Sequence, residues 1–121
     1  MEAARGPDVT ENRPTPDDPV EFVRSRLEAG KVYWTYHVNM RLVARAIDRN
    51  EVLRAATSLR LVEAYPEDKY FPSYLLLAQA VPGPFHLVCA VDVEGDNIRI
   101  VTAYRPDSAE WGDDLASRRT T

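Results

Sequence analysis

The chain has 121 residues, of which 45% are hydrophobic, and 15 Lys and Arg residues against 19 Asp and Glu residues give it a formal net charge of −4. This length and apolar content predict one domain with a single core. No apolar run approaches the roughly 20 residues that a membrane-spanning helix needs, which excludes a membrane protein, and the acidic balance argues at first against a nucleic-acid partner.

The two ends of the chain differ in composition from its middle. Residues 1–17 hold several prolines among acidic and small polar residues, and they predict a flexible acidic tail, because such a segment cannot offset the entropy of ordering it. Residues 112–121 predict a frayed polar tail. We therefore expect a single domain over residues 18–111.

The charge is divided in the same way. Residues 1–18 hold five acids and two bases, and residues 107–121 hold four acids and two bases, which leaves a net charge of +1 for residues 19–106. The acidity therefore belongs to the ends, and the objection to a phosphate-bearing ligand weakens.

The cellular compartment is predicted from Cys89 and from the first residues. A single cysteine excludes an intrachain disulfide, and the first ten residues carry charges with no apolar stretch. We expect no secretory signal and a location in the reducing cytoplasm.

The first predicted helix covers residues 19–29. Asp18 is followed by Pro19 and, three residues after the cap, by Glu21, a pattern typical of a capping box with proline in the first helical position. Gly30 is a typical stop. A short β-prone run, residues 32–34, follows.

Two more helices are predicted before the pattern changes. Thr35 favours the cap of the second helix, and a second capping box, Asp48 with Glu51, starts the third. An apolar stripe of the second helix is expected to face the core, consisting of Met40, Val43, Ala44 and Ile47.

From residue 60 onward the hydrophobic period becomes two. Four strands are predicted over residues 61–65, 73–81, 85–93 and 98–104. Short connections, Pro82-Gly83 and residues 94–97, make the last three strands antiparallel neighbours. The predicted fold class is α+β, with N-terminal helices followed by a four-stranded antiparallel meander.

Symmetric turns would fix the register of this sheet. They would pair Asp92 with Arg99, a favourable charge pair, and Gln79 with His86. Tyr104 would then lie on the face opposite His86, unless a β-bulge turns one of them around.

His37, Arg41 and Arg45 form one ridge of the second helix, because their spacing of four residues brings them to nearly the same face. Two interpretations stay open. The ridge is either a solvated face with surface ion pairs, or a phosphate site in which two guanidinium groups clamp the anion and an imidazole moves a proton.

A second group of polar side chains lies on the predicted sheet. Tyr104 and Arg105 could supply a hydroxyl and a cation near His86, and Arg99 lies on the same mixed face as Arg105. The alternatives are a hydrogen-bonded histidine at a strand end and a core tyrosine with its hydroxyl at the rim. His86 and Cys89 point to opposite faces, so no metal site is predicted, and no sequence motif predicts a cofactor.

Several blocks of the chain, taken together over residues 31–111, resemble a small bacterial family named domain of unknown function 4258. The opening "T-x-H-x-x-x-R-x-x-x-R-x-I" matches Thr35, His37, Arg41, Arg45 and Ile47. Further blocks match Tyr65-Pro66-Glu67-Asp68, Pro72-Ser73, Pro84-Phe85-His86-Leu87-Val88, residues 100–107 and Trp111.

The layout of this family is similar to that of RelE-like and BrnT-like ribonuclease toxins, which cleave RNA without a metal and are silenced by an antitoxin. The resemblance therefore implies RNA as substrate and an antitoxin-like protein as partner; the sequence carries no DNA-specific motif.

Metal-free cleavage needs an acid, a base and cations at the phosphate. The candidate catalytic residues are His37, Arg41, Arg45, His86 and Tyr104, and the candidate phosphate-binding residues are Arg41, Arg45, Arg99 and Arg105. The alternative functions are a non-catalytic binding module for a phosphate-bearing ligand or protein partner, and a scaffold whose histidines are structural.

Overall fold

The computed structural model describes residues 14–79 and 83–118. Residues 1–13 of the predicted tail, residues 80–82, which include part of the predicted first turn, and residues 119–121 lie outside the described residues. The elements in chain order are α1 (Pro19–Ala29), β1 (Val32–Trp34), α2 (Tyr36–Ala44), α3 (Arg49–Arg54), the 3-10 helix η2 (Ala55–Ser58), β2 (Arg60–Tyr65), β3 (Ser73–Ala78), β4 (Phe85–Asp92) and β5 (Asn97–Tyr104).

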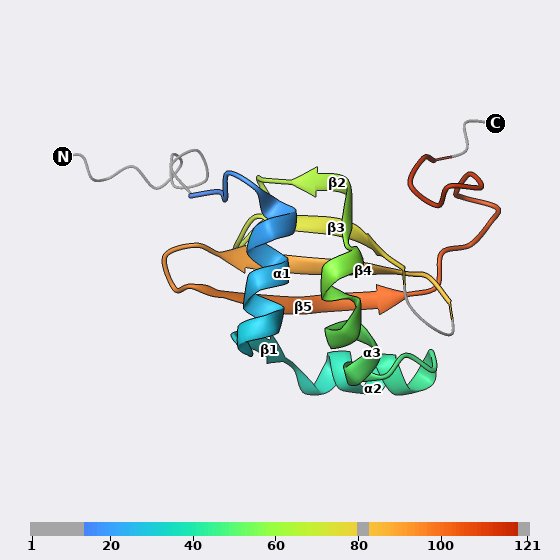
Figure 1. Cartoon of the computed structure of the whole chain (residues 1–121), viewed down its shortest axis with the longest axis horizontal. Helices are drawn as coiled ribbons and strands as arrows, with labels where there is room; N and C mark the ends of the chain where they lie inside the picture. The colour runs from blue at the N-terminus through green and yellow to red at the C-terminus, as the bar shows by residue number, and fades with distance from the viewer. Residues whose placement is uncertain (1–13, 80–82, 119–121) are drawn as a thin grey trace.

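The sheet has the strand order β1-β5-β4-β3-β2 (Figure 1). Strands β2 to β5 form the predicted antiparallel meander, and the α+β class is confirmed. The predicted count of four strands was wrong, because β1 pairs in parallel with residues 98–100 of β5 and adds a fifth strand. A run of three residues is too short to show by its own alternation that it joins a sheet.

The helices start where their caps were predicted. The side chain of Asp18 accepts a hydrogen bond from the backbone N–H of Glu21 at 3.1 Å, and Thr35 Oγ1 accepts one from the N–H of Val38 at 3.0 Å. Asp48 caps α3 in the same way, through the N–H of Asn50 at 3.0 Å. These bonds satisfy backbone donors that the first helical turn leaves without partners.

The main core lies between the helices and one face of the sheet, with α1 crossing the sheet and α2 and α3 near its β1 edge (Figure 1). Helix α2 buries Val38 and Leu42 against this core. The predicted apolar stripe was therefore wrong for three of its four residues: Met40 and Val43 are 52% and 78% exposed, and Ala44 is exposed as well. Ile47 is buried, as predicted, but lies beyond the end of the helix.

Both predicted registers were wrong. Asp92 pairs with Asn97 and not with Arg99, because the turn takes residues 93–96 and the Asp92 carboxylate accepts a hydrogen bond from the N–H of Gly95 at 2.8 Å. His86 pairs with Leu77 and not with Gln79.

A β-bulge in β5 changes which side chains share a face. Val88 pairs with Thr102 and Cys89 with Ile100, so Val101 is the extra residue. Beyond the bulge, Ala103 joins the core and Tyr104 pairs with His86. The bulge therefore brings Tyr104 to the face that carries His86, which a regular ladder would not allow.

The C-terminal segment, residues 106–118, covers part of the other face of the sheet. Trp111 is 1% exposed, and its ring meets that of His86 edge to face at 4.6 Å between centroids. The Arg118 guanidinium lies over the Trp111 ring and bonds the Glu63 carboxylate of β2 at 2.7 Å. These contacts attach residues 112–118, assigned by composition to a polar tail, to the sheet.

None of the helices in the described ranges has the length and apolar character required to cross a membrane.

Candidate functional site

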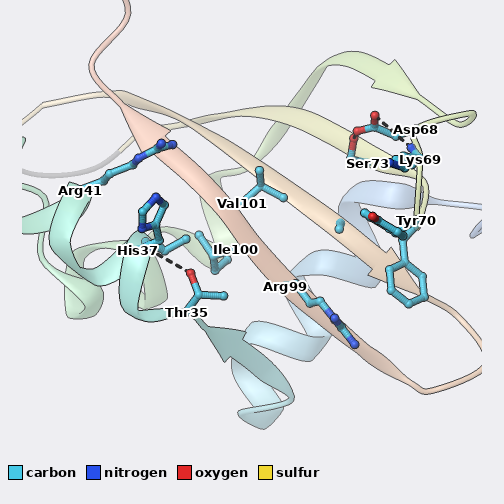
Figure 2. Close-up of a pocket in the computed structure, with 13 residues that line it drawn as sticks. Thr35, His37, Arg41, Asp68, Lys69, Tyr70, Ser73, Arg99, Ile100 and Val101 are labelled. Atoms are coloured by element: carbon cyan, nitrogen blue, oxygen red, sulfur yellow. Dashed lines mark hydrogen bonds between the residues drawn. The ribbon is translucent and has the colours of Figure 1, made fainter.

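A pocket of about 510 Å³ opens on the outer face of the sheet, between α2 and the loop that joins β2 to β3 (Figure 2). Its polar and aromatic lining comes from three parts of the chain that are distant in sequence. The lining residues are Thr35, His37, Val38, Arg41, Asp68, Lys69, Tyr70, Phe71, Ser73, Ala90, Arg99, Ile100 and Val101.

One cross-strand row forms much of the floor of the pocket. Ser73 pairs with Ala90, and Ala90 pairs with Arg99, so these three residues lie side by side on β3, β4 and β5. Small side chains at the first two positions leave space above the sheet. Val101 at the bulge adds an apolar surface that is 45% exposed.

Helix α2 supplies the histidine and one arginine of the pocket. The Thr35 cap fixes the start of the helix, and both His37 and the buried Val38 line the pocket. Arg41 follows one helical turn later and lines the same wall. Figure 2 shows both side chains on the α2 side of β5.

The β2–β3 loop supplies groups that the sequence analysis missed. Lys69 Nζ lies 5.3 Å from the centroid of the Tyr70 ring, and the Arg99 guanidinium lies 4.9 Å from the Phe71 ring and 5.6 Å from the Tyr33 ring. The sequence feature that could have indicated these groups is the run Lys-Tyr-Phe at residues 69–71, but it has neither a strand period nor a helix period. Cations interleaved with aromatic rings are typical of single-stranded nucleic-acid sites.

Two predicted phosphate-binding arginines are engaged in the fold. Arg45 Nη1 donates to Thr102 Oγ1 at 2.8 Å and to the carbonyl of Ala103 at 2.9 Å, which ties the end of α2 to the bulge. Arg105 donates to the carbonyl of Gly83 at 2.9 Å and pairs with the buried Glu51 carboxylate at 3.1 Å. Neither arginine lines the pocket.

The second predicted capping box, Asp48 with Glu51, forms only in part, because Glu51 pairs with Arg105. The Asp48 half forms, but Glu51 is 3% exposed and turns to Arg105. Leaving a buried carboxylate without a charged partner costs more free energy than leaving out a second capping bond at a helix end.

His86 and Tyr104 lie together but away from the pocket. His86 is fully buried and is four residues from the pocket residue Ala90 along β4, which corresponds to about 13 Å. His86 Nε2 lies 2.7 Å from the carbonyl of Leu115, and its Nδ1 lies 3.4 Å from the Tyr104 hydroxyl. The structure therefore brings these two residues together and does not bring either to His37.

The ionisation of this buried pair follows from its surroundings. Burial lowers the pKa of His86, and burial raises the pKa of Tyr104, so both are neutral near pH 7. A carbonyl only accepts hydrogen bonds, so Nε2 carries the imidazole proton and donates to Leu115. Nδ1 is then the acceptor that faces the phenol.

We expect the free energy of unfolding to decrease as the pH falls below about 6.5, the ordinary pKa of histidine. Because the pKa of His86 is lowered in the folded chain, the unfolded chain binds a proton at this residue first. The stabilising contribution is complete above the unfolded pKa and is lost toward the lower folded pKa, with a slope of at most about 1.4 kcal/mol per pH unit. Urea unfolding between roughly pH 7.5 and 5 measures it.

Two glutamine variants separate this effect from other titrations. His86→Gln should remove the slope, and His37→Gln, which replaces an exposed histidine, is the matched control. Carboxyl groups such as Glu63, whose pKa the Arg118 hydrogen bond lowers, lose their contribution below about pH 4.5 and lie outside this window. An unchanged slope in His86→Gln would assign the effect to another group.

The described part of the chain contains no group of three His, Cys, Asp or Glu side chains placed to hold a metal ion. Cys89 is buried, and burial raises the pKa of its thiol, which makes it a core residue of low reactivity.

The pocket combines groups suited to a phosphate ester. Three cationic side chains, Arg41, Lys69 and Arg99, line it with one carboxylate, Asp68. Arginine presents a planar set of donors that fits phosphate oxygens, and histidine is the side chain that exchanges protons most readily near neutral pH. His37 therefore lies where it can move a proton beside a bound anion.

Comparison with known proteins gives one match. The family model described as Domain of unknown function (DUF4258) matches residues 34–105, a range that runs from the end of β1 to just past β5. No curated protein and no solved structure matches the chain.

Proposed function

We propose that this chain, which belongs to the family described as Domain of unknown function (DUF4258), is a ribonuclease that cleaves RNA without a metal in the pocket of His37, Arg41 and Arg99. The observation that carries the proposal is that His37 and Arg41 of α2 lie together at one end of an open pocket whose lining also includes Arg99 of β5. A cytoplasmic location and a silencing antitoxin-like partner belong to the same proposal and rest on the resemblance to toxins.

The proposed reaction uses the 2′-hydroxyl of RNA as its nucleophile. Neutral His37 accepts the hydroxyl proton, the 2′-oxygen forms a bond to phosphorus, and the bond from phosphorus to the 5′-oxygen breaks. The leaving oxygen takes a proton from water, and the hydroxide that remains takes the proton that His37 accepted, which regenerates the base. The products are a 2′,3′-cyclic phosphate and a 5′-hydroxyl, and Arg41 stabilises the charge that builds up on the phosphate oxygens.

One observation favours the alternative, a non-catalytic module that binds a phosphate-bearing ligand or protein partner. Of the two histidines, only His37 lines the pocket, so the pocket supplies one imidazole where efficient cleavage uses an acid and a base. Binding needs only the cations. The two functions differ in one outcome, which is whether bound RNA is cut.

The Arg41→Ala variant tests both functions together. For a labelled single-stranded RNA in EDTA, we expect weaker binding and a slope of log K against log salt that is smaller by about 0.7, because one phosphate contact is lost. Cleavage should slow as well. Arg54→Ala is the matched control, an exposed helical arginine outside the pocket lining. Equal binding and equal cleavage rates in Arg41→Ala and Arg54→Ala would show that Arg41 does not contact the RNA.

A further inference from the structure

We propose that the loop side of the pocket is a nucleobase subsite, so that the ligand is single-stranded RNA; this inference rests on the proposed function. We call Lys69, Tyr70, Phe71 and Arg99 the aromatic end of the pocket. The end that holds His37 and Arg41 would take the phosphate, and the aromatic end would take an adjoining base.

The rings of the aromatic end present stacking surface to solvent. Tyr70 is 75% exposed, and Phe71 is partly exposed beside it. Arg99 lies near the Phe71 ring on one side and the Tyr33 ring on the other, and Tyr33 is itself 58% exposed. Unpaired bases stack on such rings and on arginine planes.

The charges of the pocket are also divided in a way that suits this assignment. Figure 2 shows His37 and Arg41 on one side of β5, and Asp68, Ser73 and Tyr70 on the other. The Asp68 carboxylate repels a second phosphate but tolerates a neutral base. The buried Ser73 donates its hydroxyl to Asp68 and so orients this carboxylate.

Stacking on the aromatic end requires a base that has left its own stack. In a duplex each base is covered by its neighbours and paired along its edge, so its faces cannot reach Tyr70. The pocket would therefore select single-stranded RNA over a duplex.

The test measures binding of strands that cannot be cut. The probes are a short 2′-O-methyl oligoadenosine, an abasic strand of equal length and the duplex of the first with its complement. We expect the wild type to bind the single strand about 5- to 150-fold more tightly than the abasic strand, the range for one stacked base. It should also prefer the single strand to the duplex.

Three tyrosine variants assign the preference to the aromatic end. Tyr70→Ala should lose most of it while its affinity for the abasic strand stays unchanged, and Tyr70→Phe should keep it because the ring remains. Tyr36→Ala is the control, since Tyr36 is 78% exposed but lies outside the pocket lining. Equal affinity for base-bearing and abasic strands, a preference that survives in Tyr70→Ala, or no binding would overturn the subsite.

Cleavage of unmodified RNA is measured separately, so that the two proposals fail in different ways. If RNA is cut but base-bearing strands are not preferred, the ribonuclease proposal stands and the subsite proposal fails. If base-bearing strands are preferred but RNA is not cut, the subsite proposal stands and the ribonuclease proposal fails.

Discussion

Replacing His37 by alanine is expected to lower the rate of RNA cleavage by about 10²- to 10⁴-fold, the contribution typical of a general base. The imidazole can take the 2′-hydroxyl proton near neutral pH, while Arg41 remains to hold the phosphate. The measurement is the single-turnover rate on single-stranded RNA in EDTA.

The fold and the binding of this variant should be unchanged, because the His37 side chain is exposed and the Thr35 cap is intact. The affinity of His37→Ala for the uncleavable 2′-O-methyl strand is therefore the internal control. Cleavage at the wild-type rate by a folded His37→Ala chain would mean that His37 is not the base.

Replacing Trp111 by alanine is expected to lower the free energy of unfolding by about 3–5 kcal/mol, the cost of emptying a fully buried aromatic site. Trp111 is 1% exposed, and its ring meets His86 edge to face and contacts the Arg118 guanidinium. Its loss uncovers the outer face of β3 and β4, where Leu75 and Leu77 are buried outside the main core.

Urea unfolding followed by the fluorescence of the remaining Trp34 measures this loss. Trp111→Phe is the conservative control and should lose less, because it keeps a ring against His86. A change of less than about 1 kcal/mol in Trp111→Ala would show that residues 106–118 contribute little to the fold, since most buried large side chains cost more.

The helices could be predicted because their signals are local. Asp18, Thr35 and Asp48 each satisfy backbone donors within three residues, and this does not depend on the rest of the fold. The buried face of α2 could not be predicted in the same way. In a helix of nine residues the pair Val38 and Leu42 competes with an equally apolar stripe, and the packing of α2 on β5 decides between them.

The register of the sheet depends on the turns, which the period of two does not encode. The turn between β4 and β5 takes residues 93–96, one residue earlier than the predicted 94–97, and the bond between Asp92 and Gly95 closes it. The bulge at Val101 leaves the alternation of apolar residues nearly intact while reversing the faces of the residues that follow it.

The pocket was partly visible in the sequence. His37 and Arg41 could be found from their helical spacing, and Arg99 from its place on the mixed face of the sheet. Lys69 and Tyr70 lie in a loop, where no period marks the side chains that share a site. Arg45 and Arg105 resembled ligand-binding cations because sequence does not show the carbonyl and carboxylate groups they bond.

The central claim is that the pocket of His37 cuts RNA, and mass spectrometry of the products tests it most directly. A single-stranded RNA is incubated in EDTA with the wild type, His37→Ala and Arg54→Ala. We expect fragments with 2′,3′-cyclic phosphate and 5′-hydroxyl ends from the wild type and Arg54→Ala, and intact RNA from His37→Ala. Intact RNA with the wild-type chain, or fragments that end in 3′-hydroxyl and 5′-phosphate groups, would contradict it.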